Sequence, residues 1–347
     1  MRVVSTSALP IDLAAQVAAA LPGARVSIPA SGHVGIDGVD RAELAAADAL
    51  ICLLLDRIDA AVFARAPGLR VVANCAVGID NVDVAAATAR RIAVTNTPDV
   101  LTDATAELAF ALMLAAARRL GEGERLVRSG AWTGWALDQL LGIQLTGKQL
   151  GVVGFGRIGQ AMARRALGFE MRVVYADPDE APGGTARRVP IDELFATSDV
   201  VSLHCPLTPE TRRVVNARRL GLMKPTAILV NTARGGCVDE PALIEALHAG
   251  RIFGAALDVY DREPELDPRL LACPRLTLAP HIGSATTETR TQMAQLCADA
   301  VIAVLSGRRP PNLVNSDVWP DVGPSARPSA DPDASPDARP AGSPGAS

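Results

Sequence analysis

Short runs of β-branched and aliphatic residues alternate along most of this chain with longer stretches rich in Ala and Leu. A short apolar run predicts a buried strand, and apolar positions three and four residues apart predict a helix that buries one face. Helical patterns such as Asp12–Ala20 and Val82–Ala89 separate the apolar runs of the first hundred residues. The strands predicted there are Arg2–Ser5, Ala49–Leu54, Leu69–Asn74 and Ile92–Thr95. This alternation predicts a parallel sheet with helices on both faces.

A second series of the same kind begins at Gln149. Its helical patterns include Ile158–Leu167 and Glu240–His248. Its predicted strands are Gln149–Phe155, Met171–Ala176, Asp199–His204, Ala227–Asn231, Phe253–Asp258 and Arg275–Ala279. Strands joined by helical crossovers in this number are typical of a doubly wound nucleotide-binding sheet.

Two long helices are expected outside these series. The first starts near Thr102 or Asp103, either of which can cap its amino end, and its pattern ends before Gly121. The second covers about Thr286–Leu305, which is strongly apolar on one side.

The composition changes abruptly at the carboxy-terminal end. From Trp319 onward Pro, Ala, Ser, Asp and Gly dominate, and no apolar periodicity remains. Such a segment cannot bury enough apolar surface to offset the entropy lost on ordering. We therefore expect residues 317–347 to form a disordered tail.

The bulk composition restricts the class of protein. A chain of 347 residues is long enough for two domains, and a net charge of -4 argues against nucleic acid and anionic membranes as partners. The six scattered cysteines contain no CxxC pair, which favours reduced thiols over a disulfide framework or a zinc site. The amino terminus does not resemble a signal peptide, and the longest apolar helical run, Leu108–Ala117, is too short to span a membrane. A cytoplasmic protein without a metal is expected.

A glycine-rich segment, Gly-Phe-Gly-Arg-Ile-Gly, stands between an apolar strand and the head of a helix. In a dinucleotide-binding fold Gly154 permits the tight turn, Gly156 lets the backbone approach the pyrophosphate, and Gly159 lets the helix pack closely on the strand. The backbone N–H groups of Arg157 and Ile158, at the helix amino end, then face the phosphates. The order of strand, glycines and helix gives this pattern more weight than the glycines alone.

Asp177 ends the strand that follows the glycine-rich segment. A carboxylate at this position accepts hydrogen bonds from the adenosine ribose hydroxyls and repels a 2′-phosphate. The sequence therefore favours NAD as the cofactor over NADP. The plain structural alternative is a glycine-rich turn with an unrelated surface Asp.

Three later strands are each followed by a conspicuous polar residue: Arg234, Asp258 with Glu263 soon after, and His281. Ligands of open α/β sheets bind outside the carboxyl ends of the strands, so these side chains should converge on one mouth. Reduction of a keto acid needs such a set. An arginine binds the substrate carboxylate at two points, and an imidazole can protonate the carbonyl oxygen as hydride arrives.

Glu263 beside His281 would fix the imidazole tautomer and favour its protonated form. Taken singly, each of these residues also has an ordinary explanation as a surface charge, a loop residue or part of a turn. His204 is a competing acid, although His-Cys-Pro-Leu-Thr is better interpreted as a loop under the cofactor.

These segments are also where the chain resembles the D-isomer-specific 2-hydroxyacid dehydrogenases, over about Ala49 to Asn315. The similar segments are Asn74–Asp83, Thr97–Ala109, Asn231–Gly236, Ala256–Pro264 and Pro280–Ala285. Within the family the likeness is greatest to the glyoxylate/hydroxypyruvate reductases, on the segments Leu50–Asp59, Thr97–Asp103 and Trp132–Trp135.

The resemblance implies a role for each matching residue. Arg234 corresponds to the anchor of the substrate carboxylate, assisted by the backbone at Val77 and Gly78, and His281 to the acid/base with Glu263 as its partner. Asp258 corresponds to a ligand of the nicotinamide amide. Further cofactor contacts are implied at Thr102, His204, Cys205, Pro206, Thr232, Ala233, Gly283 and Ser284.

The fold implied by the resemblance has two doubly wound domains. A Rossmann domain at 102–283 interrupts a flavodoxin-like substrate domain formed by 1–101 and 284–316. Such enzymes are usually dimers joined through the nucleotide domain and its long helix. Hydride transfer between NAD(H) and a small 2-keto or D-2-hydroxy acid is the expected reaction, with glyoxylate and hydroxypyruvate as the favoured substrates. Two alternatives stay open: an NAD-sensing, corepressor-like binding protein, and a D-3-phosphoglycerate or other D-2-hydroxyacid dehydrogenase.

Overall fold

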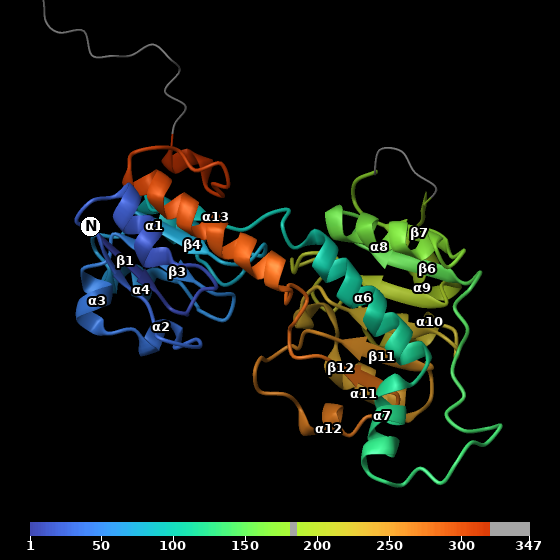
Figure 1. Ribbon diagram of the computed structural model, residues 1–347. Helices are drawn as coiled ribbons and strands as arrows, with labels where there is room; N and C mark the ends of the chain where they lie inside the picture. The colour runs from blue at the N-terminus through green and yellow to red at the C-terminus, as the bar shows by residue number, and fades with distance from the viewer. Residues whose placement is uncertain (181–185, 320–347) are drawn as a thin grey trace, which may run out of the picture.

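Two parallel sheets organise the chain in the computed structural model, which describes residues 1–180 and 186–319. Each sheet forms the centre of one of the two lobes seen in Figure 1. We call the lobe with the five-stranded sheet the smaller lobe and the lobe with the seven-stranded sheet the larger lobe. The chain passes from the smaller lobe to the larger and then returns.

The sheet of the smaller lobe has the strand order β2-β1-β3-β4-β5, and neighbouring strands are parallel throughout. This is the flavodoxin-like order, which confirms the expected fold class for this lobe. Its central strands are fully buried, as expected for a sheet covered on both faces. The strands are β1 (Arg2–Ser5), β2 (Arg25–Ser27), β3 (Ala49–Cys52), β4 (Val71–Asn74) and β5 (Ala93–Thr95).

Helices cover both faces of the smaller sheet. One face packs on α1 (Leu13–Ala20) and on α13 (Thr287–Leu305), and this packing brings the end of the chain back to its beginning (Figure 1). The other face is covered by α2 (Gly35–Gly38), α3 (Arg41–Ala45), α4 (Ala60–Arg65) and α5 (Val84–Ala89).

The sheet of the larger lobe has the order β12-β11-β10-β9-β6-β7-β8, again with parallel neighbours. The order reverses between β6 and β9, which is where Rossmann folds bind dinucleotides. The predicted nucleotide-binding sheet is thus confirmed. Its strands are β6 (Gln149–Val153), β7 (Arg172–Ala176), β8 (Arg187–Arg188), β9 (Val200–Leu203), β10 (Ile228–Asn231), β11 (Gly254–Leu257) and β12 (Leu276–Leu278).

Helices also cover both faces of the larger sheet. On one face α6 (Thr102–Ala117) packs beside α8 (Arg157–Leu167), with Met113 and Met162 buried in their shared core. The other face is covered by α9 (Ile191–Thr197), α10 (Ala217–Leu222), α11 (Glu240–His248), α12 (Pro268–Leu271) and the short 3₁₀ helix η1 (Gly235–Cys237). Among the helices of the described residues, none has both the length and the apolar character needed to cross a membrane.

One expectation about the first long helix is wrong. Neither Thr102 nor Asp103 caps α6, because Leu101 occupies the N-cap position without a side-chain hydrogen bond and Thr102 is already helical. The helix does end before Gly121 as expected, at Ala117, and a separate helix that was not predicted, α7 (Leu120–Arg128), follows after a break where Arg119 adopts a left-handed φ of 53°. Helix α7 buries no residue, which explains why an apolar pattern does not reveal it.

The edge strands β2 and β8 were also missed by the sequence analysis. They are only three and two residues long and largely exposed, so they show neither an apolar run nor a regular alternation. The ten strands that were predicted are all present, with ends shortened by up to two residues. Edge strands pair on one side only, and their local sequence therefore carries the weakest signal.

The expected boundary of the disordered tail is also wrong. Asp317 and Val318 belong to a short 3₁₀ helix, η2 (Ser316–Val318), and the side chains of Val318 and Trp319 pack against the core of the smaller lobe. These two residues bury apolar surface that the abrupt change in composition conceals. Residues 320–347, the rest of the expected tail, lie outside the described residues.

Asn315 ties the returning chain to the edge of the smaller sheet. Its side chain is 6% exposed, and its Oδ1 accepts a hydrogen bond from the Val94 N–H at 2.8 Å. Its Nδ2 donates to the Ile92 carbonyl and to the Thr88 hydroxyl, both at 2.9 Å. The amide thus supplies the partners that an additional strand would otherwise give to β5.

Replacing Asn315 by Ala should destabilise the protein. A buried donor and a buried acceptor would lose their partners, at about 1–3 kcal/mol each. We expect the melting temperature to fall by roughly 5 °C or more, which calorimetry can measure. Ser316→Ala is the matched control, because Ser316 is the exposed neighbour. Equal melting temperatures for the two variants would contradict the role of Asn315.

Candidate active site

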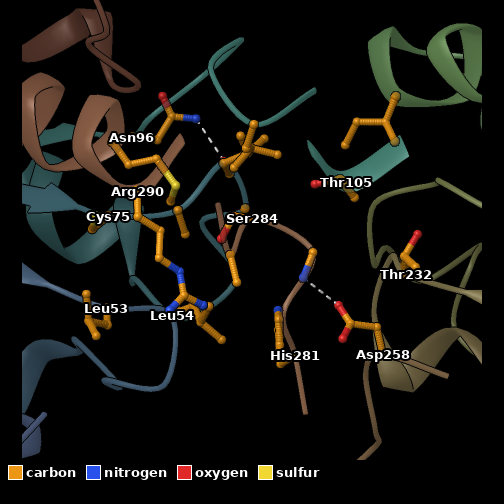
Figure 2. Close-up of a pocket in the computed structure, with 18 of the residues that line it drawn as sticks. Leu53, Leu54, Cys75, Asn96, Thr105, Thr232, Asp258, His281, Ser284 and Arg290 are labelled. Atoms are coloured by element: carbon orange, nitrogen blue, oxygen red, sulfur yellow. Dashed lines mark hydrogen bonds between the residues drawn. The ribbon is translucent and has the colours of Figure 1, made fainter. Parts of the chain in front are cut away.

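A cavity of about 1170 Å³ lies between the two lobes and is lined by residues of both. Figure 2 shows Thr232, Asp258 and His281 on one side and Leu54 and Arg290 on the other. Thr232 and Asp258 directly follow β10 and β11, so the cavity opens at the carboxyl ends of the strands of the larger sheet. Open α/β sheets bind their ligands at this place.

Most of the residues singled out in the sequence line this cavity. They are Val77, Gly78, Ile158, His204, Cys205, Pro206, Thr232, Ala233, Arg234, Asp258, His281, Gly283 and Ser284. Thr102 is not among the lining residues, whereas Thr105, one turn further along α6, is. Glu263, Asp177, Arg157 and the three glycines of the glycine-rich segment also lie outside the lining, although each lies next to residues of the site.

His281 and Glu263 form a close pair at the end of β12. The imidazole Nδ1 lies 2.6 Å from the Glu263 Oε2, which leaves Nε2 as the ring nitrogen free for a ligand. The His281 backbone has a left-handed φ of 54° and is held there by its N–H, which donates to the Asp258 carbonyl at 2.9 Å. Such a conformation is uncommon for a residue other than glycine and persists where several contacts fix it.

The turn that carries Glu263 is itself held at several points. The other oxygen of the Glu263 carboxylate, Oε1, accepts from the Tyr260 N–H at 2.9 Å. The Tyr260 hydroxyl donates to the Ala279 carbonyl at 2.7 Å, and burial raises the pKa of this phenol to about 12. A Cβ on Gly235 would lie 1.8 Å from the Tyr260 carbonyl carbon, so glycine is needed where η1 passes the turn. Glu263 is followed by a cis peptide bond to Pro264.

Asp258 holds the backbone that follows His281. The residue is 1% exposed, and its two carboxylate oxygens accept from the N–H groups of Ile282 at 2.7 Å and Gly283 at 2.8 Å. Burial raises the pKa of Asp258, while these two N–H groups and His281 act in the opposite direction. No pattern in the sequence predicts this bracing of the segment that carries His281.

Arg234 reaches across the cavity to the smaller lobe. Its Nε donates to the carboxylate of Asp80, and its Nη1 donates to the Ala233 carbonyl at 2.8 Å. A Cβ on Gly78 would lie 1.7 Å from the Arg234 Nη2, so the guanidinium rests against the Gly78 backbone. The structure thus brings the predicted anchor beside the loop that was predicted to share its task.

His204 has a different environment from His281. Its Nε2 lies 2.8 Å from the Ser202 hydroxyl oxygen, its Nδ1 is buried without a partner in the described residues, and burial lowers its pKa to about 4. An imidazole with this pKa is neutral near pH 7 and holds no proton to give as an acid. Of the two candidate histidines, only His281 has a carboxylate beside its ring.

The glycine-rich turn has space for a dinucleotide. Gly154 has a positive φ of 87°, and a Cβ there would lie 2.5 Å from the Cys205 nitrogen; a Cβ on Gly159 would lie 2.2 Å from the Gly154 carbonyl oxygen. A Cβ on Gly156, in contrast, would meet no atom within 4 Å. Gly154 and Gly159 are therefore required by the packing of the protein itself, and the open space at Gly156 suits a ligand.

The head of α8 and two polar atoms support the same site. Gly156 is the N-cap residue of α8 and offers no side chain to the first N–H groups of the helix, which begins at Arg157. The Thr232 Oγ1 and the His204 Nδ1 are buried without partners in the described residues. Unsatisfied donors and buried polar atoms of this kind fit the pyrophosphate and the polar groups of a nicotinamide dinucleotide.

Asp177 stands at the end of β7, beside the glycine-rich turn. Its Oδ2 accepts from the Phe155 N–H at 2.6 Å and its Oδ1 from the Asp179 N–H at 3.0 Å. A carboxylate oxygen can accept more than one hydrogen bond, so capacity is left for the ribose hydroxyls. The carboxylate therefore both braces the turn and fits the role predicted for it.

Several cavity residues were missed by the sequence analysis. Arg290 of α13 points toward Leu54 in Figure 2, and within the described residues its guanidinium has no hydrogen-bond or ion-pair partner. The Asn96 amide donates to the Val77 carbonyl at 2.8 Å and so steadies the loop after β4. No local pattern marks these residues, because they reach the site only through the way the lobes meet.

Comparison with known proteins gives a consistent result. Residues 110–283 match the family model described as D-isomer specific 2-hydroxyacid dehydrogenase, NAD binding domain. The glyoxylate reductase of Thermococcus litoralis is 51% identical over 279 residues, which cover 78% of this chain and 84% of that protein.

Solved structures show the same likeness. The TT0316 protein from Thermus thermophilus has a TM-score of 0.84 and 48% identity, covering 90% of this chain and 100% of that chain. The D-lactate dehydrogenase from Aquifex aeolicus, complexed with NAD and lactic acid, has a TM-score of 0.79 and 28% identity, covering 94% and 100%. With its NAD-binding fold and its catalytic segments in the expected order, the chain belongs to the D-isomer-specific 2-hydroxyacid dehydrogenase family of oxidoreductases.

Proposed function

We propose that this protein reduces glyoxylate to glycolate and hydroxypyruvate to D-glycerate with NADH, and that it catalyses the reverse reactions. The observation that carries the proposal is the His281–Glu263 pair facing Arg234 across one cavity beside the glycine-rich turn. The glyoxylate reductases among its relatives support the substrate class. The same relatives give no support to an NAD-sensing role or to D-3-phosphoglycerate as substrate.

In this proposal Arg234 and the backbone N–H groups of Val77 and Gly78 hold the substrate carboxylate. A planar guanidinium binds a carboxylate through two parallel hydrogen bonds and so fixes the orientation of the carbonyl group. The reduced nicotinamide, when bound, provides the hydride for the carbonyl carbon. The His281 Nε2 gives its proton to the carbonyl oxygen, and Glu263 stabilises the imidazolium that precedes this step.

The proposed cofactor contacts follow from the same geometry. Gly154, Gly156, Gly159, Arg157 and Ile158 would hold the pyrophosphate and Asp177 the adenosine ribose. Thr105 replaces Thr102 as the residue of α6 proposed to face the cofactor, because only Thr105 lines the cavity. The remaining proposed contacts are His204, Cys205, Pro206, Thr232, Ala233, Asp258, Gly283 and Ser284.

Arg290 favours a substrate with a polar group beyond the carbonyl. Its guanidinium lines the cavity from the smaller lobe, and its N–H donors have no partner in the described residues. The hydroxymethyl group of hydroxypyruvate can accept such a hydrogen bond, whereas the methyl group of pyruvate cannot. Hydroxypyruvate should therefore be preferred over pyruvate.

A substrate panel tests this function. With glyoxylate, hydroxypyruvate and pyruvate, each supplied with NADH and with NADPH, we expect the highest kcat/KM for NADH with one of the first two acids. Asp177→Ala should narrow the preference for NADH, because the repulsion of the 2′-phosphate is removed. The proposal would be refuted if the wild type turned over neither glyoxylate nor hydroxypyruvate. Equal efficiency with the two cofactors would refute the assignment of Asp177.

The proton donor can be tested separately. His281→Ala should lower kcat for reduction by about 10²–10⁴-fold at every pH, because general acid catalysis is lost. Glu263→Gln should keep measurable activity but lower kcat by a smaller factor, since a neutral amide stabilises the imidazolium less than a carboxylate does. NADH binding, measured by fluorescence, serves as the control and should survive both changes. Wild-type kcat in either variant would contradict these roles.

The segment between α6 and β6, residues 118–148, which we call the arm, favours a homodimer. Between α7 and β6 the chain exposes Trp132 at 53%, Trp135 at 81% and Leu137 at 81%, and α7 buries no residue. Large exposed apolar side chains gathered on one segment mark interaction surfaces, and aromatic residues are enriched at the centres of interfaces. We propose that the arm packs against the larger lobe of a second copy.

Light scattering after size exclusion can test the assembly. We expect a dimer for the wild type at micromolar concentration and a monomer for the double variant Trp135→Ser and Leu137→Ser. Val34→Ser is the control, because Val34 is an exposed apolar residue of the smaller lobe. A monomeric wild type, or a double variant that stays dimeric, would rule out the arm as the interface.

The division into domains and the cellular location are part of the same proposal. A substrate domain of 1–101 and 284–316 around a nucleotide domain of 102–283 is supported by the separate cores of the two lobes. A cytoplasmic location is supported by the six cysteines, which all carry free thiols.

A further inference from the structure

The carboxylate of Asp80 contacts the guanidinium of Arg234 across the space between the lobes. The Arg234 Nε lies 3.1 Å from the Asp80 Oδ1 and 3.3 Å from its Oδ2. Asp80 belongs to the loop after β4, whereas Arg234 belongs to the segment after β10. The ion pair therefore forms only when the two lobes meet as they do here.

The donors of Arg234 divide into two groups. A guanidinium has five N–H donors. Asp80 takes the Nε–H and the Ala233 carbonyl takes one N–H of Nη1, while the others have no partner in the described residues. The free donors belong to Nη1 and Nη2, and two adjacent nitrogens of this kind form the edge that binds a carboxylate at two points.

The backbone of Gly78 lies against the Nη2 of the Arg234 guanidinium. A Cβ at this position would lie 1.7 Å from the Arg234 Nη2 and 2.8 Å from the Asp80 Oδ1. The loop of the smaller lobe thus supplies both a surface for the guanidinium to lie on and a carboxylate to hold it there. An arginine side chain held at Nε and laid against backbone has few other positions available.

We propose that Asp80 is a positioning residue for Arg234. It holds the Nε so that the edge formed by Nη1 and Nη2 faces the substrate carboxylate next to Val77 and Gly78. Asp80 itself does not contact the substrate. Ordering a long side chain only when the substrate binds lowers affinity, and the ion pair removes this cost beforehand. The inference rests on the proposed function, in which Arg234 binds the substrate carboxylate.

Simple electrostatics predicts an effect of the opposite sign. Asp80 is a negative charge near a site for an anion, so its removal should strengthen binding of the keto acid. The side chain of Asp80 is 48% exposed and that of Arg234 is 28% exposed, so solvent screens this repulsion. The geometric effect is not screened. We therefore expect the loss of orientation to outweigh the relief of repulsion.

The test compares Asp80→Asn with Asp83→Asn. Asp83 lies in the same loop and caps α5 by accepting from the Ala86 N–H at 2.9 Å, a role that Asn also fills. Both variants lose one negative charge. Asp80→Asn should raise KM for the keto acid about 3- to 10-fold, with a smaller change in kcat and an unchanged Kd for NADH. Asp83→Asn should leave KM for the keto acid within about twofold of the wild-type value. An unchanged or lowered KM for Asp80→Asn would overturn the proposal.

A double-mutant cycle separates a positioning role of Asp80 from a merely structural one, because only a positioning role makes the effect on KM depend on Arg234. In an Arg234→Lys background there is no planar fork to orient, so Asp80→Asn should change KM by less than about twofold. The full 3- to 10-fold effect in that background would show that Asp80 acts independently of Arg234 and would overturn the proposal.

Failure of this inference can be told from failure of the proposed function. If the wild type turns over glyoxylate or hydroxypyruvate but the Asp80 variant matches it, only the positioning role is wrong. If the wild type turns over neither, the proposed function fails. Binding of oxamate in the presence of NADH then gives the same comparison without turnover. Weaker oxamate binding by Asp80→Asn than by Asp83→Asn supports the positioning role, and equal binding overturns it.

Discussion

The buried carboxylate of Asp258 is the constraint on which the site depends. Asp258 directly follows β11; its carboxylate accepts from the N–H groups of Ile282 and Gly283, while its backbone carbonyl accepts from the His281 N–H. One residue thus fixes the left-handed turn that aims His281 at the cavity. The same segment then crosses to the smaller lobe and continues into α13 (Figure 1). His281 and the return of the chain are held by a single buried group, and a buried carboxylate persists only where such donors satisfy it.

The two sheets explain why the functional groups meet although they are far apart in sequence. Parallel strands joined by right-handed crossovers place all their carboxyl ends on one edge. The smaller lobe contributes the loop after β4, and the larger lobe contributes the segments after β9, β10, β11 and β12. Because each lobe has its own core, the distance between the edges is set by a few crossing contacts, among them the Asp80–Arg234 pair. The position of the Arg234 guanidinium and the arrangement of the lobes are therefore linked.

Much of this arrangement could be predicted from the sequence, and the failures have physical causes. Strands buried on both faces gave apolar runs, and the glycine-rich turn and the pair of Glu263 and His281 stood in recognisable segments. The short, exposed strands β2 and β8 gave no such signal, and neither did α7, which buries nothing. Asp80 stood inside a segment that was singled out, but its role depends on a contact between residues 154 positions apart. The same holds for Arg290, which a helix of the smaller lobe carries into the cavity.

The charges around the cavity also explain how the site distinguishes its ligands. The charge of the Arg234 guanidinium is largely compensated by the carboxylate of Asp80 beside it. The His281 ring likewise has a carboxylate beside it, that of Glu263. His204, which has no carboxylate partner and is desolvated, stays neutral near pH 7 because burial lowers its pKa to about 4. Arg290 keeps a charge that no carboxylate in the described residues compensates. For the anionic substrate of the proposed function, the paired guanidinium of Arg234 would provide orientation more than attraction, and the unpaired guanidinium of Arg290 would provide attraction. Orientation and attraction are thus assigned to different cations from different lobes.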